Sequence, residues 1–444
     1  MVFFLPFSGH ALTSQTTRNV IQGTAPYLTF DGGRTRVVDA NGLLGITLSD
    51  GTQYMPSTNL SYITPISLPV AGQSFADISM LVPTNTNSVD LSTLIGPPNN
   101  YWGDDDGDSG VTATGRLSLS IVDKNNQAVS RSTVPEICKA PYKVTLSSTN
   151  GTLSTRYGVP NHSDFRASYV TYYVNPKASP VVCFATPSLS WGSDNYAGPA
   201  SMWAPANGFI PQSTGPSSYG RNFPTTGANK LYFDLLISGV SQPLFWSPVS
   251  LGGITVTMSN PTATSVRVTL TGPYATQSQH NSSSPISISK PTLPQTFELV
   301  GRDNNGTSVV KYGFTLKQWF VNRGSKKDRY PQTLSWCNSI GYRMPRVRDL
   351  TNASCPPGSY YDSRCRGSVG ASPSSPNNLY TRHIGSGFFS EWGTMDYYSG
   401  AGFNSGWHWT SEPFGSKQFT VDSQYGYVHG TYTNNNYYGL CSHP

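Results

Sequence analysis

The stretch GYRMPRVRDLT, residues 341–351, decides how the last third of this chain folds. Its Val347 and Leu350 are three residues apart, the spacing of one helix face, and Pro345 stands early in the pattern, where a helix can begin. The stretch therefore predicts a short helix that starts after a proline. It separates a helical pattern on its N-terminal side from a series of short strand patterns on its C-terminal side.

A second helix, with one cysteine on its buried face, is expected just before this stretch. Leu334, Cys337 and Ile340 recur at intervals of three, and Gly341 follows where a helix C-cap is expected. Still earlier, residues 311–321 mix β-branched and aromatic side chains and end at a turn signal, so they predict one strand. After the stretch, alternating segments predict antiparallel strands joined by tight turns at 406–413, 419–422, 425–430 and 437–441.

This order of elements resembles a C-type-lectin-like domain, in particular the divergent kind found at the tips of the bacterial adhesins invasin and intimin. The resemblance covers roughly the last 145 residues, and its most telling phrases are GYRMPRVRDLT, GFFSEWG (387–393) and WHWTSEP (407–413). The family pairs the cysteine of the first helix with one in the last strand, so the resemblance implies a disulfide between Cys337 and Cys441. Closing a loop of that length would contribute about 4 to 5 kcal/mol on the chain-entropy model.

The composition favours strands and turns over long helices. Charged residues make up only 12% of the 444 residues, Gly 43 and Pro 34 are abundant, and only four Glu occur. A chain of this length can form two or three domains, each with its own core. The predicted fold class is mainly β, with one or two immunoglobulin-like sandwich domains followed by an α+β C-type-lectin-like domain.

The predicted domains are 12–135, an immunoglobulin-like adhesion domain; 136–292, a second β-sandwich-like domain with a Ser/Pro-rich linker at its end; and 293–444, the C-type-lectin-like domain. Residues 25–33 and 42–48 also resemble the adhesion-domain repeat of enterobacterial exported proteins, the Zir exoprotein type. Residues 188–226 are rich in Gly, Pro, Ser and Trp, which predicts a long surface loop of a kind that often carries function.

Export from the cell is expected from both the N-terminus and the cysteines. Residues 1–11 look like the back half of a secretory signal peptide, with small residues before a cut after Ala11. An even number of cysteines without a CxxC spacing points to disulfides in an oxidising compartment. Six cysteines allow many connectivities; proximity and the resemblance together indicate Cys138–Cys183, Cys355–Cys365 and Cys337–Cys441. The expected location is secreted or at the bacterial cell surface, after export through the periplasm. No stretch reaches roughly 18 apolar residues, so no membrane span is expected.

The excess positive charge lies in the last third. Residues 300–444 carry 14 Lys and Arg against 8 Asp and Glu, whereas residues 1–299 carry 15 of each. The basic residues are densest at 323–329 and 343–348. They indicate either a solvated face or an anionic partner such as lipopolysaccharide, a sulfated glycan or an acidic protein surface. Nucleic acid is not an expected partner, since no nucleic-acid-binding motif occurs.

An acidic loop in the first third is a candidate calcium site. Asp104, Asp106 and Asp108 alternate, with Gly107 between the last two, so their carboxylates could wrap a hard cation. No glutamate follows at the distance that an EF-hand loop requires. The alternative is an acidic, solvated hairpin loop.

Motifs for catalysis are weak. His162, Ser163 and Asp164 are the residue types of a hydrolase triad, but sequence neighbours rarely converge in that way. GxSxG and phosphate-binding glycine motifs do not occur. The Glu-Pro-Asn loop with which C-type lectins hold calcium is represented only by Glu412-Pro413-Phe414, which makes calcium-dependent sugar binding doubtful. No catalysis and no certain cofactor are predicted.

A recognition surface remains as the functional hypothesis. Tyr, Trp and Arg anchor protein interfaces, and tyrosines with interspersed asparagines crowd the last 50 residues. The candidate partner-binding residues are Arg343, Arg346, Arg348, Tyr425, Tyr427, Tyr432, Asn435 and Tyr437. The competing explanation is that many of these aromatic residues, Trp407 and Trp409 above all, form the domain's own core.

The predicted function is that of a secreted or surface-displayed adhesin, similar to invasin. It would bind a protein receptor on a host cell or a bacterial outer-membrane barrel partner. The first alternative is a lectin that binds glycans at a non-standard site, and the second is a secreted glycan- or peptide-active enzyme.

Overall fold

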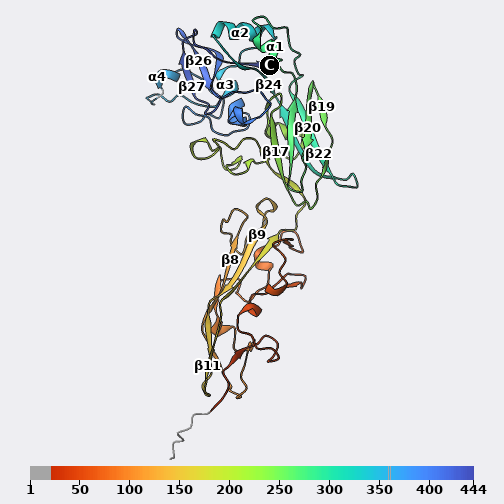
Figure 1. Ribbon diagram of the computed structural model, residues 1–444, viewed down its shortest axis with the longest axis vertical. Coiled ribbons are helices and arrows are strands. Elements are labelled where there is room, and N and C mark those ends of the chain that lie inside the picture. Colours follow the sequence, from red (N-terminus) through yellow and green to blue (C-terminus); the bar gives the residue numbers. More distant parts are fainter. Residues whose placement is uncertain (1–21, 359, 361) are drawn as a thin grey trace, which may run out of the picture. The chain divides into compact units, whose positions relative to one another are not determined.

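The computed structural model describes residues 22–358, 360 and 362–444, and the expected signal-peptide remnant at 1–11 lies outside them. The described residues form two compact units, which divide between residues 178 and 179. In Figure 1 the first unit runs from red to yellow and the second from yellow-green to blue. Each unit has its own hydrophobic core. The protein is mainly β, as predicted.

The first unit is built around a five-stranded sheet of order β4-β12-β9-β8-β5. Strand β8 illustrates why these residues form a sheet with one buried face. Its Leu117, Leu119 and Ile121 are buried and alternate with more exposed residues. Smaller sheets pair β1 with β6, β2 with β3, and β10 with both β7 and β11.

The strands of the first unit are β1 (Tyr27–Leu28), β2 (Ile46–Thr47), β3 (Gln53–Tyr54), β4 (Ile66–Ser67), β5 (Ser88–Asp90), β6 (Trp102–Gly103), β7 (Thr112–Ala113), β8 (Arg116–Val122), β9 (Tyr142–Ser148), β10 (Gly151–Ser154), β11 (His162–Phe165) and β12 (Ser168–Asn175). Short 3-10 helices lie between them: η1 (Asn41–Leu43), η2 (Pro56–Thr58), η3 (Phe75–Asp77), η4 (Leu91–Thr93) and η5 (Ile137–Lys139).

The domain boundary expected at 135/136 falls inside this first unit. Strands β8 and β9 lie on either side of it and pair antiparallel from Leu117–Ser148 to Val122–Lys143. Strand β12 then pairs with β9 on its other edge. Because strand pairing depends on contacts distant in the sequence, the alternation of strands and turns did not reveal which strands share a sheet. The unit therefore continues to residue 178.

The second unit begins with a β-sandwich. A seven-stranded sheet, β14-β15-β13-β17-β21-β20-β19, faces a three-stranded sheet, β18-β22-β23. Phe233 of β17 and Phe314 of β23 meet between the two sheets, with ring centroids 6.0 Å apart. Strands β17, β19, β20 and β22 are labelled in Figure 1.

The remaining sheet of the second unit has the order β16-β24-β28-β25-β26-β27 and carries the helices of the lectin-like part. Helix α2 is joined to β28 by the disulfide Cys337–Cys441, whose Cα atoms are 5.5 Å apart. Helix α3, Val347–Leu350, coincides with the predicted helix after Pro345. The order of a strand, a cysteine-bearing helix, a second helix and a β-meander ending in a cysteine is as expected, so the predicted fold class is confirmed.

The strands of the second unit are β13 (Val181–Thr186), β14 (Trp203–Ala204), β15 (Gly208–Phe209), β16 (Thr226–Ala228), β17 (Tyr232–Ser238), β18 (Phe245–Trp246), β19 (Val249–Leu251), β20 (Ile254–Ser259), β21 (Ser265–Thr271), β22 (Gln295–Arg302), β23 (Ser308–Leu316), β24 (Gln318–Asp328), β25 (Trp407–Phe414), β26 (Lys417–Asp422), β27 (Val428–Thr431) and β28 (Tyr437–His443). The helices are α1 (Gln277–Asn281), α2 (Tyr330–Ser339), α3, α4 (Asp362–Cys365), α5 (Phe388–Trp392), η6 (Asp194–Tyr196), η7 (Pro216–Arg221) and η8 (Met395–Tyr397).

Three expectations for this unit need correction. The single strand predicted at 311–321 is two strands, β23 and β24, which break at Lys317. The Ser/Pro-rich segment expected as a linker contains helix α1, whose end packs on α2, because the Trp336 indole donates to the carbonyl of Gln279 at 2.8 Å. The boundary expected at 292/293 does not separate two cores, since one core runs from Ala185 to Cys441.

Candidate functional site

A cluster of partly exposed aromatic rings forms the most distinctive surface of the second unit. We call it the aromatic surface, and its members are Trp191, Tyr196, Tyr425 and Tyr427. The loop between β13 and β14 supplies the first two, and the turn between β26 and β27 supplies the others. Ring centroids lie 4.8 Å apart for Trp191 and Tyr425, 5.3 Å for Trp191 and Tyr196, and 5.2 Å for the stacked pair Tyr425 and Tyr427.

The turn that carries Tyr425 and Tyr427 is held rigidly. The Asp422 carboxylate accepts hydrogen bonds from the backbone N–H groups of Gln424 and Tyr425, each at 2.9 Å. Gly426 has φ +73°, and a Cβ there would lie 2.6 Å from the buried Tyr380 ring. Only glycine fits this position without strain, so the turn presents the two tyrosines in a fixed orientation.

Trp191 is held outward by a strained backbone. Its φ is +51°, a conformation rare for a bulky side chain, and its side chain is 41% exposed. The loop is anchored underneath by buried groups: the Trp203 indole donates to the carbonyl of Gly192 at 2.6 Å, and the Arg382 guanidinium donates to the carbonyl of Ser188. Strain that the surrounding structure over-determines is typical of binding sites.

The aromatic surface is uncharged at neutral pH. Burial raises the pKa of Tyr196 above its ordinary value, and a hydrogen bond with the Tyr427 hydroxyl adds to the effect. The surface therefore combines apolar rings with polar hydroxyl tips, the chemistry that favours protein interfaces. Trp191 and Tyr196 were not among the predicted residues. The sequence feature that pointed to them was the Trp-containing segment 188–226. It was predicted as one long surface loop, but it also contains η6, β14, β15 and η7.

The other predicted tyrosines have different surroundings: Tyr432 lies in the turn between β27 and β28, and Tyr437 begins β28. Tyr432 is 58% exposed, and the Lys417 ammonium lies 4.6 Å from its ring centroid. Asn435 donates from Nδ2 to Thr431 Oγ1 at 2.7 Å. Tyr437 is half-buried against Trp409, with ring centroids 5.2 Å apart, so it belongs partly to the core.

The three predicted arginines lie at and before helix α3 and have different roles. Arg343 donates to the Asp349 carboxylate at 2.6 Å and to the carbonyl of Pro444 at 2.9 Å, so it tethers the chain end. Arg346 is the N-cap residue of α3, and its backbone N–H donates to the Asp349 carboxylate at 2.7 Å. Arg348 is exposed.

The alternative explanation for the aromatic residues near the C-terminus was that they form the domain's own core, and this is correct for some of them. Trp409 is fully buried and donates from its indole to the carbonyl of Asp328 at 2.9 Å. Trp407 is half-buried and packs on His429, with ring centroids 5.5 Å apart. These two rings pack within the lectin-like part. In the aromatic surface Trp191 is exposed, and its three tyrosines are half-buried.

The acidic loop is not arranged as the expected calcium site. Asp106 accepts from the backbone of Thr24 at 2.8 Å, Asp108 accepts from the backbone of Tyr157 at 3.3 Å, and Asp104 accepts from the backbone of Asp108 at 3.0 Å. Within residues 22–358, 360 and 362–444, no group of three or more His, Cys, Asp or Glu is placed to hold a metal ion. The carboxylates serve as acceptors that join separate backbone segments, which their sequence spacing could not reveal.

His162, Ser163 and Asp164 do not form a triad. They follow one another on strand β11, where successive side chains point to opposite faces. Asp164 accepts from the Thr152 hydroxyl at 2.8 Å, and Ser163 donates to the carbonyl of Pro26. In the lectin-like part, Glu412 accepts from the backbone of Val347 at 2.6 Å and so stabilises the start of α3.

The cysteines are oxidised. The disulfides Cys337–Cys441 and Cys355–Cys365 are both present. Cys138 and Cys183 are each disulfide-bonded, and the part of the chain that the structure describes contains no free cysteine. The described residues also contain no helix long and apolar enough to cross a membrane.

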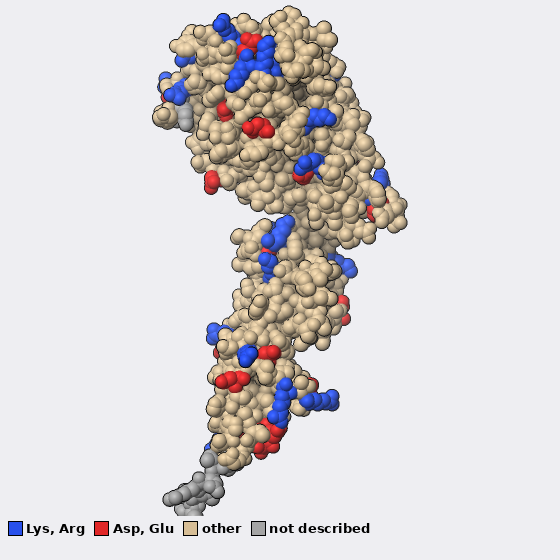
Figure 2. Space-filling view, viewed as in Figure 1, with Lys and Arg blue, Asp and Glu red and all other residues tan. Residues whose placement is uncertain are grey.

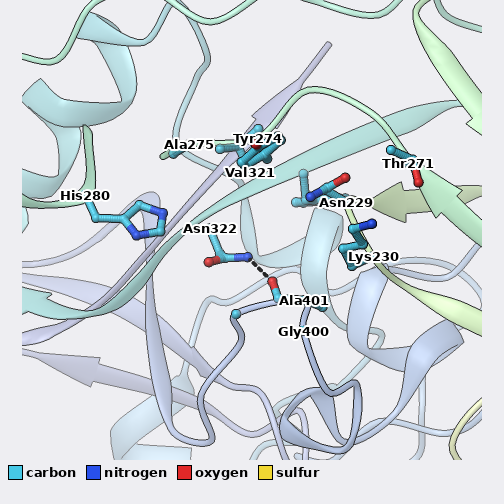
Figure 3. Close-up of a pocket in the computed structure, with 12 residues that line it drawn as sticks. Asn229, Lys230, Thr271, Tyr274, Ala275, His280, Val321, Asn322, Gly400 and Ala401 are labelled. Atoms are coloured by element: carbon cyan, nitrogen blue, oxygen red, sulfur yellow. Dashed lines mark hydrogen bonds between the residues drawn. The ribbon is translucent and has the colours of Figure 1, made fainter. Parts of the chain in front are cut away.

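A cavity of about 420 Å³ lies where the sandwich meets the lectin-like part (Figure 3). Lys230, Tyr274, His280 and Asn322 line it, and Asn322 donates to the carbonyl of Ala401 at 2.9 Å. Burial lowers the pKa of His280, so its ring is neutral at pH 7. Polar and apolar side chains both line the cavity, and they come from several elements that share one core.

Comparison with known proteins finds similarities to bacterial adhesins, among them invasin and intimin. No family model matches the chain. A stretch of 121 residues, 27% of this chain, is 31% identical to the inverse autotransporter adhesin YeeJ of Escherichia coli K12. This chain covers only 4% of the length of that adhesin.

Among solved structures, the fold is similar to that of invasin, described as a bacterial integrin-binding protein. The identity is 13% and the TM-score is 0.36, over 76% of this chain and 52% of invasin. It is also similar to a C-terminal 282-residue fragment of intimin in complex with the intimin-binding domain of the translocated intimin receptor. In that comparison the identity is 11% and the TM-score is 0.32, over 69% of this chain and 95% of the fragment.

Proposed function

We propose that this chain is an adhesin that binds a partner protein through the aromatic surface of its second unit. The observation that carries the proposal is the convergence of Trp191, Tyr196, Tyr425 and Tyr427 from two separate segments. Their rings are partly exposed, their backbones are fixed, and one of them is strained. A pre-organised aromatic surface loses little conformational entropy on binding and buries a large apolar area.

The partner class follows from the surface and from the relatives. A set of Tyr and Trp side chains without charged groups suits a protein partner. The intimin fragment was solved bound to a protein receptor, and invasin is named an integrin-binding protein, so a receptor on a host cell is the first partner to test. A bacterial outer-membrane barrel is the second. We place the protein outside the cell, either secreted through the periplasm or displayed at the surface. We propose no reaction for it.

The test is capture of membrane proteins by the full chain, from host cells and from the outer membrane of the producing bacterium. The double variant Trp191→Ala/Tyr425→Ala should lose the specifically captured protein. The matched control is Phe245→Ala/Tyr274→Ala, which removes two exposed aromatic rings of the same unit, 62% and 56% exposed, that lie outside the aromatic surface. Equal loss in both variants, or undiminished capture by the first, would overturn the proposal.

A further inference from the structure

Two adjoining hollows form a groove elsewhere on the second unit. Their volumes are about 460 and 220 Å³, and both are lined by Thr225, Lys317 and Gly385. We call the combined feature the basic groove. Its walls come from the segment before β16, the break between β23 and β24, helix α3 and the segment 369–387.

Three cations without acidic partners line the basic groove. Arg221, Lys317 and Arg348 are all exposed. In the part of the chain that the structure describes, none of the three forms an ion pair with an acidic side chain. Asp349 also lines the groove, but its carboxylate is paired with Arg343 at 2.6 Å. The groove therefore presents net positive charge to a ligand.

The floor of the basic groove is fixed by a buried carboxylate. Glu391 accepts from the backbone N–H groups of Thr225 and Thr226, each at 3.0 Å, from both threonine hydroxyls at 2.6–2.7 Å, and from the Gly385 N–H at 2.8 Å. Because Glu391 is fully buried and its carboxyl oxygens face these donors, neither oxygen is available to a ligand in the groove. Gly387 has φ +101°, and a Cβ there would lie 2.6 Å from the backbone nitrogen of Thr351. The groove is thus pre-organised.

We propose that the basic groove binds a sulfated polysaccharide. Sulfate groups offer several acceptor oxygens and no donors, which matches two guanidinium groups and an ammonium that have only donors. The groove also offers the side chains of Gln318 and Ser372, which can hydrogen-bond sugar hydroxyls. Among the described residues no aromatic side chain lines it, so it lacks the anchors that a peptide or an acyl chain would use.

The low charge of the rest of the protein strengthens this proposal. Most of the face in Figure 2 is uncharged, and its Lys and Arg side chains are scattered or mixed with acidic ones. The basic groove, by contrast, brings three cations without acidic partners to one concave site. The site is separate from the aromatic surface and does not depend on the proposed protein partner. Only Arg348 was singled out from the sequence, because Arg221 and Lys317 lie outside the two dense basic stretches.

The experiment measures binding of a fluorescent heparin decasaccharide to the full chain. The variant Arg221→Gln/Lys317→Gln/Arg348→Gln should bind about tenfold more weakly or worse, because three charge-assisted contacts are lost. The matched control, Lys326→Gln/Lys327→Gln/Arg329→Gln, removes the same charge from another basic segment and should change Kd by less than about twofold. Circular dichroism and thermal unfolding should be as for the unchanged protein, since all three replaced groove residues are exposed.

Three other arms identify the ligand chemistry. Desulfated heparin of equal length should bind weakly, and poly-glutamate of equal charge should not compete. If the two triple variants lose heparin affinity equally, net charge alone explains the binding, and the proposal that the basic groove is the binding site is overturned. Tight, groove-dependent binding of poly-glutamate or of desulfated heparin would overturn the sulfate assignment. The Trp191→Ala/Tyr425→Ala variant should bind heparin normally, so failure of the protein-adhesion proposal would be visible separately.

Discussion

At the scale of single residues, His408 illustrates how burial controls charge in the lectin-like part. Its ring is 2% exposed and lies against Phe389 and Tyr438, with centroids 5.5 and 5.4 Å away. Its Nδ1 lies 2.9 Å from the carbonyl of Gly406, which can only accept, so Nδ1 carries the proton of the neutral ring. Burial lowers the pKa of His408 from 6.5 to about 4, because a second proton would place a charge in the core.

The second unit should therefore lose stability in mild acid. The folded pKa lies below the unfolded one, so between pH 6.5 and about 4 the unfolded chain binds more protons. The contribution of the neutral His408 ring to the free energy of unfolding is fully present above pH 6.5. It decreases by about 3 kcal/mol as the pH falls toward the folded pKa. Urea unfolding at pH 7.5 and pH 4.0, followed by tryptophan fluorescence, measures this loss.

The variant His408→Gln should be less stable than the unchanged protein at pH 7.5 but closer to it at pH 4.0, because glutamine does not titrate. His162→Gln, an exposed replacement in the first unit, is the control and should leave the pH dependence of this transition unchanged. A stability difference between His408→Gln and the unchanged protein that is the same at both pH values would contradict the assigned cause.

At the residue scale, partly exposed candidates could be predicted from the sequence, but the residues that hold them in place could not. Tyr425 and Tyr427 stood out because aromatic residues are dense near the C-terminus. Glu391 had no visible role in GFFSEWG, since its partners Thr225 and Thr226 lie about 165 positions away. Trp191 looked like one more residue of an irregular loop. Their roles depend on contacts between distant segments, which periodicity and spacing do not encode.

At the scale of elements, the two described disulfides close loops of very different length. Cys337–Cys441 spans 104 residues and joins helix α2 to strand β28, whereas Cys355–Cys365 spans 10 residues next to α4. On the chain-entropy model the long loop contributes about 4 to 5 kcal/mol and the short loop about 3 kcal/mol. The long disulfide also ties the last strand to the first helix of the lectin-like part.

Replacing Cys441 with Ser should destabilise the entire second unit and spare the first. The sandwich and the lectin-like part share one core, so unfolding should include residues 179–292 as well as the last third. The variant Cys355→Ser/Cys365→Ser is the comparison and should cost less stability. Hydrogen exchange by mass spectrometry measures the affected range. Protection that is lost only after residue 292 would show that the two parts unfold separately.

Element types were more predictable than element partners. Helix α3 is evident from Val347, Leu350 and Pro345, because helical spacing and a proline start are local signals. The break at Lys317 was missed because β23 and β24 are both strands, and their combined composition reads as one. The boundary at 135/136 was misplaced for a related reason: it falls in the segment 123–141, which joins β8 to β9, and only the pairing of these two strands shows that they share a sheet.

At the scale of the whole molecule, two separate cores predict two separate unfolding transitions. The core of the first unit runs from Leu28 to Val174 and that of the second from Ala185 to Cys441. Tryptophans are unevenly divided: of nine, only Trp102 precedes residue 179. Tryptophan fluorescence therefore reports chiefly on the second unit, whereas far-ultraviolet circular dichroism reports on the strands of both.

We expect the two signals to separate in a guanidinium titration, and one substitution in each unit should move them independently. Cys441→Ser should shift the fluorescence transition to a lower guanidinium concentration. It should leave the part of the dichroism curve that reports on the first unit unchanged. Tyr172→Phe should do the reverse, because it removes a buried hydroxyl that donates to the carbonyls of Leu44 and Tyr54 at 2.9 and 3.2 Å, at a cost of about 1 to 2 kcal/mol. Coincident transitions that both substitutions shift together would show a single cooperative molecule, because independent cores cannot transmit such a change.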